Sequence, residues 1–299
     1  MKRILSAALA ALLLGAPAWQ ALHAQDDAIV VTGEREKARL RAASLAKAIT
    51  SPPPAGTPLA RQYQPLCLRV FGIQADVAAI IADRIADNAR SAGVIIAKPG
   101  CQANAFLGVF RGGRGAVERL RKEQPWLFET MLRYEVDRVF AGTSPVYAWH
   151  ATEVRSVDGR PLPTGEIDIG GRKAEVKMNN QYAGGRLVSP IRADVTGSIV
   201  LIEGAATQGK TAGQIADYAS MRLLAPLRDA PADRHGVETI LSLFDADASP
   251  PAELTTFDRA YLRGFYRLGP GAGAAAMHDA TMKAYADAEK AVAADPPAG

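Results

Sequence analysis

Residues 66–93 read LCLRVFGIQADVAAIIADRIADNARSAG, and this stretch decides the fold class. It opens with a β-type run over 66–72 that ends in a glycine. Over residues 74–92 apolar side chains recur every three or four positions, which predicts an amphipathic helix. Gly93 stands where a glycine commonly ends a helix. The stretch therefore predicts a strand that leads directly into a helix.

The rest of the chain continues to mix strands and helices. Strands are predicted over 94–97, 105–110, 145–157 and 198–203, the last of them central because residues 199–202 are all apolar. Helices are predicted over 114–140 with a break near Pro125, and over 210–225, 237–244, 255–267 and 274–293. Thr255 and Asp258 have the spacing of a capping box, and residues 158–190 read as hairpins or a long flap. We expect an α+β fold, with a mixed β-sheet, packed helices and a helical C-terminal part.

The first 24 residues have the layout of a secretory signal peptide. Lys2 and Arg3 precede an apolar run over 4–16, Pro17 ends the run, and Ala24 offers a small residue for cleavage. The run is too short to favour a membrane-spanning helix. We therefore expect a periplasmic or secreted protein with no transmembrane span after cleavage.

The sequence predicts four parts. Residues 1–24 are the signal peptide, and residues 25–60 form an N-terminal arm and a Pro-rich linker. Within that arm, residues 28–33 are a short β-type run, and residues 34–49 are helix-prone. Residues 61–270 form the α+β domain, and residues 271–299 a C-terminal helix and tail.

Charge and cysteine content narrow the possible partners. The formal net charge is +4, of which Lys2 and Arg3 supply two, so no concentrated basic face for nucleic acid is expected. Cys67 and Cys101 are the two cysteines of the chain, and in an exported protein such a pair predicts a disulfide. The alternative is two buried free thiols.

One motif matches a known phosphate-binding pattern. Residues 204–211, GAATQGKT, fit the loop of nucleotide-binding proteins and stand between a strand and a helix. Asp245 ends an apolar run and offers an acid for magnesium. Three observations oppose this reading: exported proteins meet little ATP, the motif follows the last predicted strand instead of the first, and Asp245 lies on a helix-like segment. Nucleotide binding is therefore the least favoured function.

Candidate catalytic residues are few. Asp217, Tyr218 and Arg222 share the predicted helix 210–225, and His150 lies on a predicted strand. His150 and Glu153 are three positions apart and face opposite sides of that strand, so they make no metal site. We expect no metal and no cofactor.

Two segments carry a family resemblance. Residues 214–222, QIADYASMR, and residues 254–263, LTTFDRAYLR, resemble an exported protein family of Gram-negative bacteria with no assigned function. The order of elements is similar to that of zincin-type metallopeptidases. The helix that would carry His-Glu-x-x-His shows Asp217 and Met221 instead, so the resemblance implies a scaffold without its metal ligands.

These observations favour a non-catalytic binding domain. We expect a peptide, a protein or a cell-wall or other envelope component to bind in a cleft between the sheet and the helical tail. The alternative is a hydrolase whose site the sequence does not identify, with Asp217, Tyr218, Arg222 and His150 as candidate residues.

Overall fold

The computed structural model describes residues 19–125, 128, 131, 133–141, 144–179 and 189–294. The chain divides into two units between Ala38 and Arg39, and helix α1 (Trp19–Ile49) crosses this division. Residues 1–18 of the expected signal peptide lie outside the described residues. The β-type run expected over 28–33 is instead part of α1, because its apolar residues stand between helix-forming neighbours on both sides.

The second unit is built on a mixed sheet whose central strand is β7 (Ile191–Glu203). Along one edge β7 pairs with β4 (Val146–Ser156), which is antiparallel to it. Along the other edge it pairs with β1 (Ala60–Arg61) and then β3 (Ala105–Phe110), both parallel. Strand β2 (Leu68–Phe71) is parallel to β3 and ends the sheet on that side, so β4 and β2 are its two outer strands. The expected α+β class and mixed sheet are confirmed.

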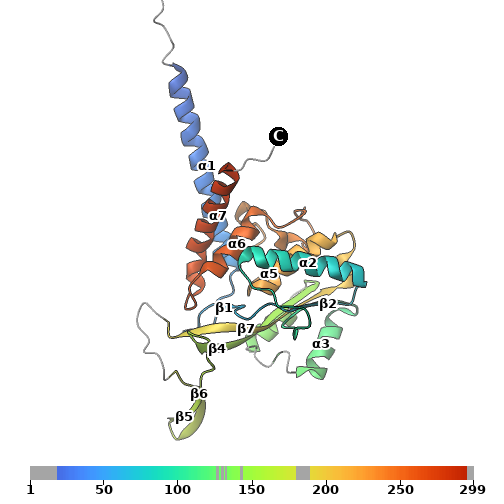
Figure 1. Ribbon diagram of the computed structural model, residues 1–299. Helices are drawn as coiled ribbons and strands as arrows, with labels where there is room; N and C mark the ends of the chain where they lie inside the picture. The colour runs from blue at the N-terminus through green and yellow to red at the C-terminus, as the bar shows by residue number, and fades with distance from the viewer. Residues whose placement is uncertain are drawn as a thin grey trace, which may run out of the picture. The chain divides into compact units, whose positions relative to one another are not determined.

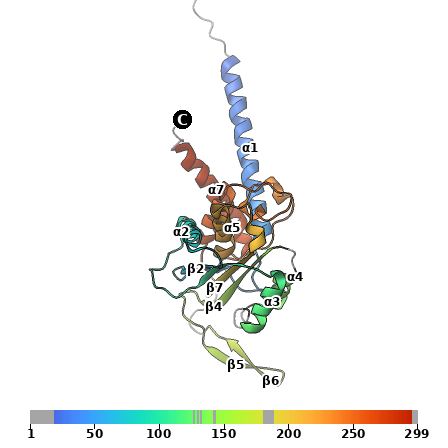
Figure 2. The same ribbon diagram turned by 90° about the vertical axis from the view of Figure 1, so that its right-hand side faces the viewer.

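Helices cover both faces of this sheet (Figures 1 and 2). The face that carries Val200 and Ile202 packs into the larger core, and the helices of that side are α2 (Ala75–Ala92), α5 (Ala212–Leu224), α6 (Thr256–Arg267) and α7 (Met277–Ala294). The face that carries Ile199 and Leu201 packs into a smaller core, next to α3 (Gly113–Glu123) and α4 (Arg133–Ala141). This split follows from the alternation of side chains along a strand.

A hairpin of β5 (Thr164–Ile169) and β6 (Arg172–Lys177) stands apart from the main sheet. Its two-residue turn is Gly170-Gly171, both with positive φ, which suits the tight turns that join antiparallel strands. The hairpin expected within residues 158–190 is therefore present, and residues 180–188 of the expected flap lie outside the described residues.

Several local predictions are confirmed. Helix α2 buries Ile81, Ile85 and Ala89, and it ends at Gly93, whose φ is 97°. Thr255 and Asp258 form both hydrogen bonds of the capping box that opens α6. The C-terminal end of α2 and the N-terminal end of α6 are thus determined by residues close to them in sequence.

Two other predictions are wrong. Residues 94–97 form no strand. Their β-pairing is limited to one isolated bridge between Ile96 and Leu66, and the side chain of Ile95 is exposed to solvent. Residues 237–244 contain only the short 3-10 turn Ile240–Ser242 instead of a helix. Thr239 holds this turn, because its side chain accepts a hydrogen bond from the N–H of Leu241.

The compact unit begins before the boundary expected at residue 61. Leu45, Ala46 and Ile49 of α1 are fully buried in the larger core. The Pro-rich segment that follows is held by backbone hydrogen bonds, from Ser51 N to Pro226 O and from Leu59 N to Ala272 O. This segment is thus packed against the domain. In the described part of the chain, no helix combines the length and the apolar composition that crossing a membrane requires.

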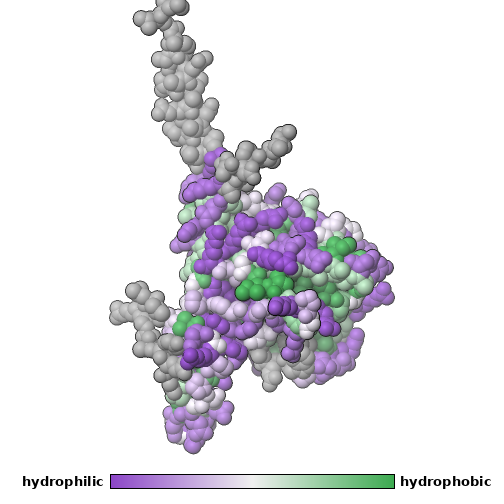
Figure 3. Space-filling view, viewed as in Figure 1, coloured by the Kyte–Doolittle hydropathy of each residue, from purple (hydrophilic) through white to green (hydrophobic). Residues whose placement is uncertain are grey.

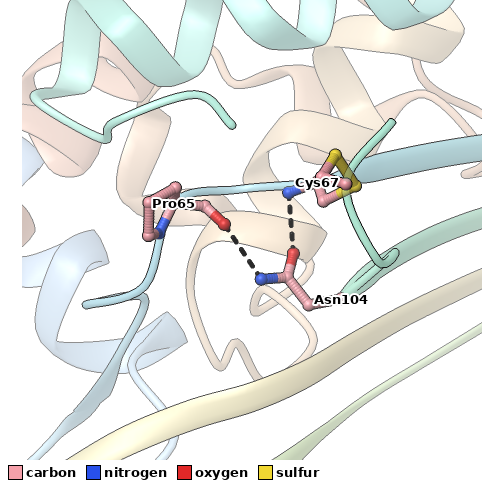
Figure 4. Close-up of a disulfide and its surroundings, with 4 residues drawn as sticks. Pro65, Cys67 and Asn104 are labelled. Carbon is pink, nitrogen blue, oxygen red and sulfur yellow. Dashed lines mark hydrogen bonds between the residues drawn. A yellow bond between two sulfur atoms is a disulfide. The ribbon is translucent and has the colours of Figure 1, made fainter. Parts of the chain in front are cut away.

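The predicted disulfide between Cys67 and Cys101 is confirmed, with a Cα–Cα distance of 6.0 Å. Asn104 supports it (Figure 4): its Oδ1 accepts a hydrogen bond from Cys67 N at 2.8 Å, and its Nδ2 donates to Pro65 O at 3.0 Å. The disulfide joins the start of β2 to the loop before β3, so the loop that it closes contains the whole of α2.

The surface seen in the orientation of Figure 1 is mostly hydrophilic, with apolar side chains gathered in patches (Figure 3). Exposed large apolar residues of the unit include Phe71, Ile80 and Ile95. They come from β2, from α2 and from the loop after α2.

Candidate binding pocket

A cavity of about 140 Å³ lies beside strand β4 and extends across the sheet to Ala193 of β7 and Ala60 of β1. Its walls come from the Pro-rich segment over 51–60, from β4, and from the C-terminal end of α5 with the two residues Pro226 and Leu227. The walls are mainly apolar, and they include Trp149 and Val154 of β4. His150 and Arg222 supply the basic side chains. All of these residues belong to the second unit.

His150 lies on the α5 side of β4, and its Nε2 is 3.1 Å from the carbonyl oxygen of Leu223. Burial, together with the positive charge of Arg222, lowers the pKa of His150 to about 4. The ring is therefore neutral at pH 7, and Nε2 carries the hydrogen because a carbonyl oxygen can only accept. Nδ1 is then a hydrogen-bond acceptor, and His150 forms part of the pocket wall.

Arg222 brings a positive charge to the same cavity. Its Nε donates to the hydroxyl of Tyr218 at 3.1 Å, and its Nη2 donates to Asp229 at 3.0 Å. The Arg222 side chain is 12% exposed, whereas the Asp229 side chain is 80% exposed. A carboxylate so well hydrated offsets a buried guanidinium only weakly. The pocket therefore has a positive polar end.

Asp217, in contrast, lies away from this pocket. Its buried carboxylate accepts hydrogen bonds from Arg84 at 2.8 and 2.6 Å, from Asn88 at 2.7 Å and from the N–H of Leu254 at 2.9 Å. These donors come from α2 and from the segment before α6. Of the four candidate residues, His150, Tyr218 and Arg222 thus come together, whereas Asp217 joins three parts of the fold.

The positions of α5 where a zincin would carry its metal ligands are occupied by Asp217 and Met221. Met221, like Asp217, is fully buried in α5. Over the ranges that the structure describes, no three His, Cys, Asp or Glu side chains are grouped as ligands for a metal ion. The likeness of element order to the zincins stays a prediction.

The segment 204–211 does not have the geometry of a phosphate cradle. Lys210 N donates to Thr207 O at 3.1 Å, within the loop itself. The N–H groups of Thr211 and Gln214 are taken by the capping box of these same two residues, at 3.1 Å each. A phosphate loop needs such N–H groups free for its ligand.

A second cavity, of about 420 Å³, lies at the carboxyl ends of β2, β3 and β7. Such ends are the usual ligand sites of parallel sheets. Here, however, the carboxylate of Glu203 lies against Gly113 in the first turn of α3. The charged residue in the lining of this cavity is Arg111, which is exposed, so no buried charged group orients a ligand there, and the cavity beside β4 is the better candidate site.

No protein family, curated protein or solved structure matches this chain. The case for a function therefore depends on the geometry of the pocket.

Sequence reasoning missed the largest wall of this pocket. The proline run over 51–58 indicated a linker, and only the apolar pair Leu59-Ala60 at its end signalled that it packs. The cleft was expected between the sheet and the helical tail, but that space is filled by the larger core. The cavity lies instead beside β4, where the chain brings together segments far apart in sequence.

Proposed function

We propose that this protein is an exported, non-catalytic binding domain that takes a peptide or another envelope component into the cavity beside β4. The observation that carries the proposal is the combination of an apolar cavity, a buried cation and the outer edge of a strand in one place. Pockets with mainly apolar walls and few oriented polar groups are typical ligand sites.

The strand edge favours a peptide as ligand. Among the described strands β4 pairs only with β7, and its outer edge has a single isolated bridge, between Arg155 and Pro161. The pocket wall includes residues from both faces of β4, such as Trp149 and His150, so the cavity borders the edge itself. An extended peptide can hydrogen-bond to such an edge as an additional strand.

The hydrolase alternative is less well supported. A histidine with a pKa of about 4 is a weak general base at neutral pH. Ser198 pairs with His150 across β4 and β7, but its hydroxyl is fully buried and Ser198 does not line the cavity. The arrangement is better suited to holding a ligand than to cleaving one.

Export is supported by the sequence of residues 1–24 and by the Cys67–Cys101 disulfide, since disulfides persist outside the cytoplasm. Intact-mass measurement on a periplasmic fraction of the native host should give a chain that begins at Gln25. Full-length protein recovered from the cytoplasm would contradict export.

The binding function is tested by NMR titration of the purified protein with a pool of short extended peptides and with soluble fragments of cell wall. We expect the amide signals of β4 from Ala148 to Val154 to shift. The variant Thr152→Phe fills the cavity and should abolish the shifts, whereas Thr164→Phe on the separate hairpin should not. Unchanged β4 signals at millimolar ligand would refute the proposal.

A further inference from the structure

The polar end of the cavity indicates which part of a peptide it takes. A guanidinium has five N–H donors in a planar fork, which matches the two oxygens of a carboxylate. Arg222 uses Nε on Tyr218 and Nη2 on Asp229, and in the described part of the chain Nη1 has no acceptor. Because Arg222 lines the cavity, its guanidinium is within reach of a ligand there.

The size of the cavity limits what lies beside that group. A volume of about 140 Å³ is close to that of engineered cavities of about 150 Å³, which hold one benzene molecule. Trp149, Val154 and Leu59 make much of the surrounding wall apolar. The space therefore fits a single apolar side chain, and a longer ligand must continue outside it along the strand edge.

The neutral ring of His150 adds an acceptor to this end. Arg222 is close enough to lower the pKa of His150, so the two side chains form one polar group of opposite hydrogen-bonding character. The C-terminal residue of a peptide offers groups that match both side chains, since its carboxylate can accept from Arg222 and its backbone N–H can donate to His150. A residue in the middle of a peptide has no carboxylate in its backbone.

We infer that the cavity binds the free carboxyl terminus of a peptide whose last side chain is apolar, with Arg222 Nη1 on the terminal carboxylate and the peptide extending along β4. This inference rests on the proposed function and specifies its ligand. Charge complementarity carries it: among the described residues, the carboxylate that pairs with this buried cation is that of Asp229, and it is largely hydrated.

The test uses two fluorescently labelled peptides, Ala-Ala-Val-Leu with a free carboxyl terminus and the same peptide with a terminal amide. Fluorescence anisotropy with the wild-type protein should give a dissociation constant at least tenfold larger for the amide. A third peptide that ends in glycine should also bind more weakly, because it leaves the cavity unfilled.

Variants connect this preference to Arg222. Arg222→Gln should bind the acid and the amide equally. Because that change also removes the contacts with Tyr218, Asp229→Asn is the second variant: it keeps Arg222 in place and removes its competing carboxylate. We expect Asp229→Asn to bind the acid about threefold more tightly and the amide unchanged. Arg228→Gln is the matched control, since Arg228 is exposed and does not line the cavity.

The outcomes separate the two claims. Absence of binding by all three peptides, together with unchanged β4 signals in the NMR titration, would refute the proposed function itself. Equal binding of acid and amide to the wild-type protein would leave the proposed function standing and overturn the inference. An equal loss of acid binding in Arg228→Gln and Arg222→Gln would also overturn it, because general charge attraction would then explain the preference.

Discussion

Replacing Asp217 by asparagine should destabilise the fold strongly. The Asp217 side chain is 0% exposed and accepts hydrogen bonds from Arg84, from Asn88 and from the N–H of Leu254. Asparagine removes the charge and turns an NH₂ donor toward these donors. Breaking a buried ion pair costs about 3–5 kcal/mol. The Arg84 side chain is 37% exposed and regains water, so we expect the lower end, ~3 kcal/mol.

Thermal unfolding followed by circular dichroism measures this loss. For a chain of this size ~3 kcal/mol corresponds to a decrease in Tm of about 6–12 °C. The matched control is Asp87→Asn on α2, because the Asp87 side chain is 73% exposed and pairs with Arg90 one turn away. That variant should change the free energy of unfolding by less than about 0.5 kcal/mol. Equal Tm values for the two variants would refute the view that Asp217 joins α2, α5 and the segment before α6.

Three further predictions concern the disulfide, His150 and Lys210. The double variant Cys67→Ala/Cys101→Ala should lose ~3–4 kcal/mol in denaturant unfolding, because the disulfide closes a loop with a sequence separation of 34; two titratable thiols in denatured, unreduced wild-type protein would contradict the bond. Because the folded protein holds His150 neutral with a pKa of about 4, against 6.5 for a free histidine, protonation favours the unfolded chain, and stability should fall as the pH drops from 6.5 towards 4. The ring is partly exposed, so we expect the free energy of unfolding to fall by ~2 kcal/mol from this effect. The measurement is denaturant unfolding at several pH values, in which wild type should lose more stability towards pH 4 than His150→Gln does. Parallel pH profiles of the two proteins would contradict this prediction. Millimolar ATP or GTP with magnesium should leave the Tm unchanged. A protein with a working phosphate loop would instead be stabilised by about 2.7 kcal/mol at a hundredfold excess of nucleotide over Kd. Lys210→Ala should change the free energy of unfolding by less than about 0.5 kcal/mol.

The elements that the sequence predicted well are those with a local cause. Helix α2 has a regular apolar face and a glycine at its end, and α6 has both residues of its capping box. Strand β7 begins at Ile191, although only residues 198–203 were predicted as a strand. The prediction was too short because Arg192 and Asp194, in the first half of the strand, are charged. In the folded protein these two side chains pair with each other at 2.7 and 2.9 Å, which makes a charged stretch compatible with a central strand.

The candidate site depended on long-range contacts that the sequence does not display. His150 meets the end of α5 because of the register of β4 against β7, and the Pro-rich segment over 51–60, which closes the pocket, lies at least 90 positions before His150 in sequence. Asp217 looked like a catalytic acid because nothing near it in sequence shows the contact with Arg84, at a separation of 133 positions. Helices and their caps could be predicted from local sequence patterns, whereas the residues that line the pocket could be identified only from the tertiary structure.

The burial of residues 39–50 has a consequence for the order of folding. This segment leaves the ribosome early, but its partners are made late: Thr50 Oγ1 bonds with the hydroxyl of Tyr261 at a separation of 211 positions, and Arg39 bonds with Glu289 at a separation of 250. Until Tyr261 and Glu289 are synthesised, these hydrogen bonds cannot form, and the part of the larger core that α6 and α7 supply is missing. Contacts of such high sequence separation slow folding. The nascent chain therefore completes its core only when nearly all of it has been made.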